Sequence, residues 1–303
     1  MQSTLTEFVA EPSPELVTTT VQPDTLQPDS IEQIGRSVLQ HGPLNDRVYL
    51  MKVDPADAQR LMKAVYELAE ANGYSKLFAK VPQDVIPLFT QHGFTKEACV
   101  PRMQNGKKDI CFMSRFLRLW RQQPDTPKKI HQALQIAKAK GYQKPPALTG
   151  GYTLHEMQPK HTEEMAKLYD TVFPSYPFPI NDSEYLCDCM KDNVRFFGAM
   201  QKGRIVALAS AEMDAAHANA EMTDFATLPK HRGKRLARHL LHHMEQCLLQ
   251  SGFQTAFTIA RAVSIGMNAT FARSGFDFAG TLVNNTNISG KIESMNVWHK
   301  SLA

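Results

Sequence analysis

The chain has 303 residues, of which 43% are hydrophobic and 21% charged, with a formal net charge of +4. This length exceeds that of one typical domain and favours two folded units. The composition is typical of a soluble globular protein, the apolar runs are too short to cross a bilayer, and the spread of charge argues against a nucleic-acid-binding surface.

The N-terminal segment and the cysteines indicate the cellular compartment of the protein. Residues 1–30 are rich in Pro, Thr and Gln, without a basic start or an apolar core, and predict a disordered tail rather than a secretion signal. Five cysteines, an odd number without a repeated spacing, favour a reduced cytoplasmic protein over a disulfide framework.

Residues 31–118 are predicted to form a first, smaller α/β domain. Hydrophobic periodicity predicts strands over residues 47–53, 76–81 and 110–116 and helices over residues 55–71 and 84–92. Residues 119–149 follow as a proline-rich linker with a basic helix over residues 128–140, whose lysines we interpret as a solvated face.

Residues 150–303 are predicted to form a second, larger domain of mixed α/β type. A meander of strands precedes one crossover helix. The strands are expected over residues 152–157, 194–200, 205–213, 220–228, 254–260, 278–284 and 291–299, and the helices over residues 159–173, 182–190, 233–250 and 263–274.

The two domains share an order of elements. In each, an apolar helix leads to a glycine and an aromatic residue, Gly73-Tyr74 and Gly252-Phe253, and then to a strand. A glycine and a phenylalanine follow a second helix in each, Gly93-Phe94 and Gly275-Phe276. We interpret the first domain as a partial copy of the C-terminal half of the second, with chance similarity of short units as the alternative.

The turn before the long helix of the second domain carries a basic sequence. It consists of Arg232, Gly233, Lys234, Arg235, Leu236 and Ala237. A helix start offers free N–H groups and a positive dipole end, which suit a pyrophosphate. A basic first turn without a ligand is the alternative, but basic residues are unfavourable there unless an anion binds.

This turn resembles the pyrophosphate loop of the Gcn5-related N-acetyltransferases, the GNAT superfamily. The loop pattern is Arg or Gln, two residues, Gly, one residue, and Gly or Ala. Arg232 and Ala237 match its ends, while Arg235 stands at the central glycine, where we expect helical backbone angles. The resemblance implies acetyl-CoA as the cofactor, held also by main-chain groups of Phe225 and Thr227.

A later segment extends this resemblance. Asn268 and Phe271 lie where the family has its next helix, and the resemblance implies that they contact the cofactor. Phe271 stands where a tyrosine often protonates the departing thiolate. A phenylalanine cannot donate a proton, so the general acid is another group or solvent.

Longer runs, covering nearly the whole chain from Ile31, resemble the β-lysine N-acetyltransferases. They are residues 41–50, 78–82, 176–179, 284–287 and 293–298. The resemblance implies a GNAT fold with a mixed, mostly antiparallel central sheet flanked by helices and preceded by a partial GNAT-like domain. It further implies acetylation of the terminal N6 amine of β-lysine, lysine 2,3-aminomutase as a pathway partner, and a product used as a compatible solute. The alternatives are another amine, such as a polyamine, lysine or a protein N-terminus, and a non-catalytic module that senses acyl-CoA.

Acidic residues near the loop supply candidate bases. An alkylammonium with a pKa of about 10.4 must lose a proton before its nitrogen can attack a thioester. We predict Glu221 as the base, on one strand face with Thr223, and we expect Asp224 to point to the other face. Asp224 and Glu212 are alternative bases or ammonium anchors, and solvent-facing charge is the remaining interpretation.

Other polar residues are candidates for substrate binding or metal binding. Tyr176, Asn284 and Asn285 lie in predicted loops where the acceptor pocket is expected, although turn formation also explains the asparagines. His239 and His243 share a helix face, but the absence of a third ligand predicts no metal site.

The first domain is predicted to lack a second cofactor site. Asp54 and Asp57 precede its helix, where they would cap the free N–H groups and repel a pyrophosphate. We therefore expect one coenzyme A per chain. The oligomeric state is not indicated by the sequence.

Overall fold

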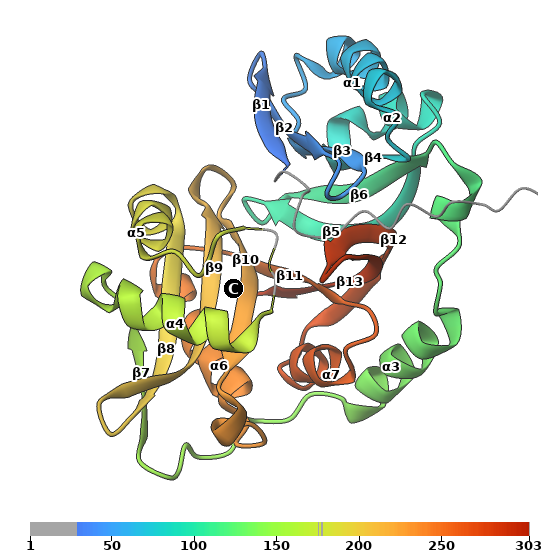
Figure 1. The fold of residues 1–303 in the computed structure, drawn as a ribbon. Helices are drawn as coiled ribbons and strands as arrows, with labels where there is room; N and C mark the ends of the chain where they lie inside the picture. Colours follow the sequence, from blue (N-terminus) through green and yellow to red (C-terminus); the bar gives the residue numbers. More distant parts are fainter. Residues whose placement is uncertain (1–28, 175, 177, 303) are drawn as a thin grey trace, which may run out of the picture.

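The computed structural model describes residues 29–302 except residues 175 and 177. Residues 1–28 of the predicted tail lie outside the described residues, and Ser30 already begins the first strand. The described residues form one sheet of 13 strands with helices on its faces (Figure 1).

The first half contains six strands and two α-helices. In chain order they are β1 (Ser30–Ile34), β2 (Ser37–Gly42), β3 (Arg47–Lys52), α1 (Ala58–Asn72), β4 (Lys76–Pro82), α2 (Ile86–Gln91), β5 (Thr95–Gln104) and β6 (Lys108–Phe116). A short 3-10 helix (Leu119–Gln122) and the basic helix α3 (Pro127–Lys140) connect it to the second half.

The second half contains seven strands and four α-helices. In chain order they are β7 (Tyr152–Glu156), α4 (Thr162–Val172), α5 (Ser183–Asp192), β8 (Val194–Gln201), β9 (Arg204–Asp214), β10 (Asn219–Thr227), α6 (Leu236–Gln250), β11 (Thr255–Arg261), α7 (Ile265–Arg273), β12 (Asp277–Ile288) and β13 (Lys291–Ser301). Parallel pairing joins only β3 to β4 and β10 to β11 within the described sheet, so the mostly antiparallel mixed class is confirmed.

The two halves have the same topology, in agreement with the repeat inferred from the sequence. The sheet order is β2-β3-β4-β6-β5 in the first half and β9-β10-β11-β13-β12 in the second. The parallel pair in each half is joined by a crossover helix, α1 or α6, and each half ends in an antiparallel hairpin. Strand β3 therefore corresponds to β10, and β4 to β11.

The halves join through equivalent edge strands. Strands β5 and β12 pair antiparallel, with Gly280 opposite Ala98. Gly280 has a φ of 150°, and a Cβ built there would lie 2.1 Å from the carbonyl oxygen of Glu97. Only a glycine lets the two backbones approach so closely. Equivalent strands that pair antiparallel relate the two halves by an approximate twofold axis.

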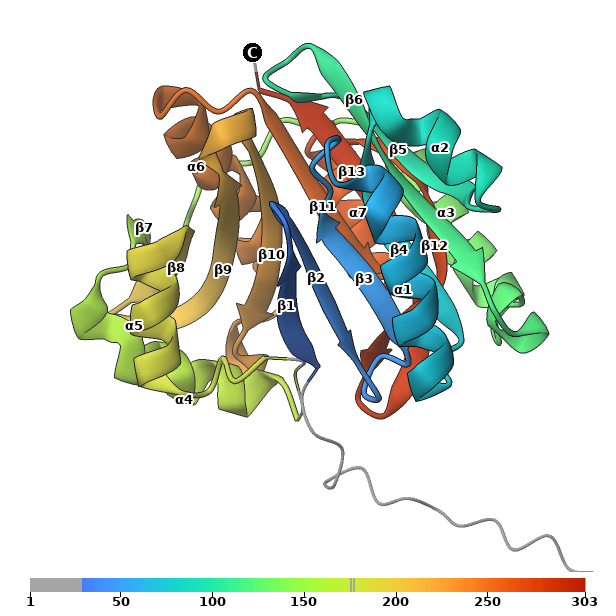
Figure 2. The same ribbon diagram turned by 90° about the horizontal axis from the view of Figure 1, so that it is seen from above.

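Separate hydrophobic clusters hold the helices and the two halves in place. Helices α1 and α2 cover the outer face of the first half, and α6 and α7 cover one face of the second. Helices α4 and α5 cover the opposite face of β8 and β9. A further cluster packs the inner faces of the two halves together through Phe78 on β4, Phe112 on β6 and Phe257 on β11. The sheet thus curls until β3 lies near β11, with Tyr49 packed in the same cluster as Phe257 and Ile259 (Figure 2).

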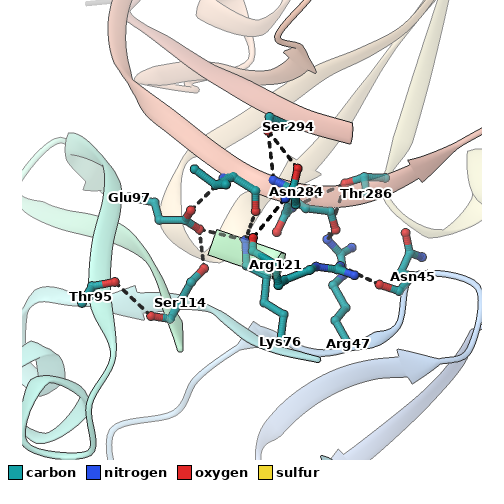
Figure 3. A network of polar contacts seen from close by, with 12 residues as sticks. Asn45, Arg47, Lys76, Thr95, Glu97, Ser114, Arg121, Asn284, Thr286 and Ser294 are labelled. Atoms are coloured by element: carbon teal, nitrogen blue, oxygen red, sulfur yellow. Dashed lines mark hydrogen bonds and ion pairs between the residues drawn. The ribbon is translucent and has the colours of Figure 1, made fainter. Parts of the chain in front are cut away.

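Buried polar groups surround this junction (Figure 3). Lys76 lies 3.0 Å from the carboxylate of Glu97 and donates to the carbonyl of Val283 at 2.7 Å. Arg47 donates to the carbonyl of Asn285. Burial lowers the pKa of Lys76 to about 8 and that of Arg47 to about 10. Both cations belong to the first half, whereas their acceptors belong to both halves: Glu97 to the first, and the carbonyls of Val283 and Asn285 to the second.

Two expectations from the sequence are corrected. The preference for free cysteines is wrong for one pair, because Cys99 and Cys111 lie directly opposite on β5 and β6 and form a disulfide. Spacing along the chain does not reveal cross-strand neighbours. The long helix begins at Leu236 rather than at residue 233, because the chain is not helical over the preceding three residues.

Candidate active site

A cavity opens where β10 and β11 separate. Their parallel ladder joins residues 219–221 to residues 255–257 and ends there. A bulge between Thr223 and Ala226 then disturbs the pairing of β10 with β9. Residues from both strands line a cavity of about 350 Å³. Diverging strands leave main-chain N–H and C=O groups without ladder partners along such a cavity.

The predicted pyrophosphate loop borders this cavity. Among the described residues, the backbone N–H groups of residues 233–237 donate to no acceptor. Arg232 lines the cavity, and its Nε donates to the carbonyl of Thr227 at 3.2 Å. Gly233 has a φ of 77° with open space around it. A row of free N–H groups with exposed basic side chains fits a pyrophosphate, although Leu236 can contribute only its backbone because its side chain is buried in the core.

The backbone of Arg235 differs from the expectation. We predicted helical angles, but Arg235 has a φ of 63° and is the N-cap of α6. A left-handed conformation costs a non-glycine residue about 1–2 kcal/mol. The glycine of the family pattern therefore suits this position for a backbone reason, and this chain tolerates an arginine in the same conformation.

The corresponding turn of the first half is occupied by carboxylates. Asp54 accepts from the backbone N–H of Ala56 at 2.9 Å. Asp57 is the N-cap of α1, but its side chain accepts from no backbone N–H of the helix, which corrects the predicted cap. Its carboxylate accepts instead from the backbone N–H of Arg36 at 2.7 Å and from Ser37. Two carboxylates at this helix start oppose a second anion.

Aromatic side chains form the apolar wall of the cavity. The rings of Phe225 and Phe271 meet edge to face with centroids 5.6 Å apart, and both line the cavity. Asn268 does not line the cavity, which corrects its predicted contact with the cofactor. Its side chain is fully buried, donates to two carbonyls at the start of α7, and accepts from Asn296 and Trp298 at 2.8 Å each.

Two glutamates face each other on β9 and β10. Glu212 and Glu221 are directly paired in the antiparallel ladder, so their side chains lie on one face. Burial, and then the charge of Glu212, raises the pKa of Glu221 to about 8. Glu212 keeps contact with solvent, yet the protein around it excludes enough water to raise its pKa to about 7, with Asp224 adding a like charge.

Asp224 lies in the bulge and does not point away from Glu221 as predicted. It has a φ of 53°, and its carboxylate accepts from Ser210 at 2.5 Å. Ser210 pairs with Thr223 and so lies on the Glu221 face. The extra residue of a bulge breaks the two-residue alternation on which our prediction rested.

Tyr176 completes the surroundings of Asp224. Its hydroxyl donates to the Asp224 carboxylate, and its ring lines the cavity. Burial, and then the charge of Asp224, raises the pKa of Tyr176, so the hydroxyl keeps its proton. With hydroxyl donors from Tyr176, Ser210 and Thr223, the Asp224 carboxylate is already engaged. The Glu221 side chain, in contrast, makes no hydrogen bond to another described side chain.

Asn284 and Asn285 lie at the junction of the halves, which corrects their predicted role in the acceptor pocket. Asn284 is buried, and its amide donates to the carbonyls of Arg121 at 3.1 Å and Gln123 at 2.9 Å (Figure 3). Asn285 is also buried, and its backbone carbonyl accepts from Arg47, while its side-chain Oδ1 accepts no hydrogen bond from the described residues. The side chain of Asn284 and the backbone of Asn285 therefore hold the connector and the first half against β12.

Two residues of the first half interact electrostatically with the glutamates, and neither was assigned a role from the sequence. Burial and the charges of Glu221 and Glu212 raise the pKa of Tyr49. Lys80 lowers the pKa of each glutamate. Both residues belong to runs quoted above for their family resemblance, and this was the only available signal.

The described residues form neither a metal-binding cluster nor a membrane-spanning helix. No group of three or more His, Cys, Asp or Glu side chains in residues 29–302, leaving aside 175 and 177, could hold a metal ion. No helix in this described part is long and apolar enough to cross a membrane.

Comparisons with known proteins agree with this geometry. Residues 162–276 match the model of the acetyltransferase (GNAT) family. The chain is 36% identical over 274 residues to a β-lysine N6-acetyltransferase of Methanococcus maripaludis, covering 90% of this chain and 98% of that protein. It is 30% identical to the N-acetyltransferase YodP of Bacillus subtilis, covering 90% and 99%. A β-lysine N6-acetyltransferase of Methanosarcina mazei is 40% identical over 155 residues, which are 51% of this chain and 57% of that protein.

Proposed function

The chain is an acetyl-CoA-dependent N-acetyltransferase of the GNAT family, and from this premise we propose that its acceptor is the N6 amine of β-lysine. The observation that carries the proposal is the match to the Methanococcus maripaludis enzyme, which extends over both halves. Residues that line the cavity come from the second half, but Tyr49 and Lys80 of the first half interact electrostatically with Glu221 beside it, so a match limited to the GNAT domain would say less about the acceptor.

The cavity and the loop suit the acyl donor. Acetyl-CoA, when bound, supplies an activated acyl group. We expect the N–H groups of residues 233–237, with Arg232, Lys234 and Arg235, to hold its pyrophosphate. Main-chain groups of Phe225 and Thr227 would pair with its pantetheine arm, while the rings of Phe225 and Phe271 would exclude water.

Glu221 is the proposed general base. The acceptor ammonium must lose a proton, and a carboxylate with a pKa of about 8 is a stronger base than an ordinary glutamate. Its position where β10 and β11 diverge is beside the cavity that would hold the acyl group. Asp224, engaged by Ser210 and Tyr176, would fix the bulge rather than accept the proton.

The second amine of β-lysine requires an unreactive anionic partner. Glu212 suits this task because it is paired with Glu221 and remains open to solvent. We propose that it anchors the second ammonium while Glu221 receives the proton from the N6 amine. Tyr176 would border the acceptor on the α4 side of the cavity.

The wider roles follow from the family resemblance. We propose that residues 150–303 form the catalytic domain, that residues 31–118 shape the acceptor site, and that residues 119–149 link them. Lysine 2,3-aminomutase would supply β-lysine in the cytoplasm, and the acetylated product would serve as a compatible solute.

An amine panel tests the acceptor. The purified chain is incubated with acetyl-CoA and β-lysine, α-lysine or spermidine, thiol release is followed, and the acetylated nitrogen is identified by NMR. We expect the highest kcat/KM with β-lysine and acetylation at N6. A higher kcat/KM with spermidine or α-lysine would assign another acceptor. Coenzyme A binding without thiol release from any amine would contradict the proposed acceptor and point to an acyl-CoA-sensing role.

A further inference from the structure

Lys80 projects from the first half toward the proposed acceptor site. It lies on β4 on the same face as Phe78, whose ring belongs to the cluster between the two halves. The Lys80 Nζ lies 5.3 Å from the ring centroid of Phe257 on β11. Phe257 is the ladder partner of Glu221, so the ammonium lies beside the strand position of the proposed base.

This ammonium has no anionic partner of its own among residues 29–302, with 175 and 177 left aside. No carboxylate there lies within 4.0 Å of Nζ, although Lys80 is half-buried. In contrast, Lys76, four residues earlier on the same strand face, is paired with Glu97 at 3.0 Å. Glu212 and Glu221 interact with this ammonium only from beyond 4.0 Å, so a partly desolvated cation without an ion pair remains able to bind an anion directly.

Packing does not explain a lysine at this position. Lys80 and Ile259 both lie seven residues after the glycine that ends the crossover helix of their half, Gly73 and Gly252. They are therefore equivalent in the repeat. Ile259 packs as an apolar side chain in the cluster between the halves. The first half thus has a cation where its copy has a hydrocarbon side chain.

We propose that Lys80 binds the carboxylate of the acceptor and so selects an amino acid over a plain diamine. This inference rests on the proposed function. The acceptor would extend from the cavity between β10 and β11, past Glu221, to the first half. Its reacting amine would lie at the base, and its carboxylate would lie at Lys80 over the Phe257 ring. The pyrophosphate of acetyl-CoA is not a competing ligand, because its loop lies at the other end of β10.

A comparison of β-lysine with β-lysine amide tests this role. The amide keeps both amines and the chain length but carries no negative charge. We expect the kcat/KM ratio of acid to amide to fall about 10- to 100-fold in Lys80→Met, the range of a lost charge-assisted hydrogen bond. Lys80→Arg should keep most of the ratio. Any effect of the lysine on the Glu221 pKa acts on both acceptors and cancels in the ratio.

Lys138→Met is the matched control. Its Nζ also lies over an aromatic ring, 4.6 Å from the Phe278 centroid, but it belongs to α3 outside the acceptor site. We expect it to keep the wild-type ratio. Calorimetric binding of coenzyme A by all three variants confirms that they are folded.

Each outcome decides between the two proposals. If wild type acetylates β-lysine and Lys80→Met retains the wild-type acid-to-amide ratio, Lys80 does not bind the carboxylate and the acceptor assignment survives. If wild type fails to acetylate β-lysine, the proposed function is overturned and the inference falls with it. A ratio lost equally in Lys138→Met would also overturn the inference.

Discussion

Replacing Glu221 by glutamine provides the sharpest test of the proposed base. Glutamine keeps the size and can accept a hydrogen bond, but it cannot take the ammonium proton. We expect kcat to fall about 10²-fold or more, the usual range for a lost general base. Coenzyme A binding should change little, because the pyrophosphate loop lies beyond the other end of β10.

The pH dependence of kcat follows from the pKa of Glu221. A pKa of about 8 leaves about one tenth of the carboxylates ionised at pH 7 and about nine tenths at pH 9. With saturating acceptor, wild-type kcat should therefore rise about tenfold over this range and level off above pH 9. The glutamine variant should instead keep rising toward the amine pKa of about 10.4, as more of the acceptor is deprotonated by solvent.

The same substitution should change stability in a defined direction. The folded-state pKa of Glu221 is raised above the ordinary value of 4.5, so between pH 4.5 and about 8 the folded state holds more protons than the unfolded state. The free energy of unfolding therefore falls as pH rises through this window. Above pH 8 the glutamine variant should have the higher Tm, by a few degrees, and the difference should disappear below about pH 4.5.

Stopped-assay kinetics from pH 6 to 10 and thermal melts at pH 4.5 and 9 measure both effects. Glu221→Asp serves as the control that keeps the carboxylate and moves it. A glutamine variant with wild-type kcat at pH 7, or with the same plateau above pH 9, would show that Glu221 is not the base. An unchanged Tm at pH 9 would contradict the buried charge on which the pKa argument depends.

Three further predictions concern the cofactor loop, the first half and the junction. Gly233→Val and Arg232→Glu should each weaken coenzyme A binding about tenfold or more in calorimetric titration, because they disturb the backbone and the charge of the loop, and unchanged affinity in both folded variants would remove this segment from the cofactor site. The same titration of wild type should give one coenzyme A per chain, and a stoichiometry near two would mean that the first half also binds it despite Asp54 and Asp57. Asn284→Ala should lower the free energy of unfolding by about 2–3 kcal/mol through its lost buried hydrogen bonds, with the acceptor KM unchanged, whereas a raised KM without destabilisation would return Asn284 to the acceptor pocket.

Long periodic elements were predictable, whereas edge strands and bulges were not. The basic helix predicted over residues 128–140 is observed as α3 (Pro127–Lys140). Strand β5 was missed because it contains Pro101, which argues against a strand. The pairing of β5 with β6 shifts between Val100 and Gln104, so the proline lies in an irregular stretch without a ladder partner. Strands β1 and β2 were also missed, within a segment that carried no clear alternation.

The carboxylates of the site could be predicted in part, but their surroundings could not. Glu212 and Glu221 lie on successive strands, so a hairpin register could bring them together. The Asp224 side chain lies on the Glu221 face only because of the bulge, and no residue pattern predicts that bulge. Tyr49 and Lys80 are more than 120 residues from Glu221 in the chain, and only the curl of the sheet brings them near it. Whether these residues contact a substrate stays a prediction.

Because β5 pairs with β12, the two halves of this one chain are arranged like the two subunits of a twofold dimer. In a dimer of identical chains, any substitution appears on both sides of the axis at once. Covalent linkage removes this constraint, so one copy can retain the anion-binding loop while the other diverges. Tyr49 lies where the catalytic copy has Glu221, and Lys80 lies where it has Ile259. Because the two copies share one chain, dilution cannot separate them, and the contact between them should persist at concentrations at which a comparable dimer would dissociate.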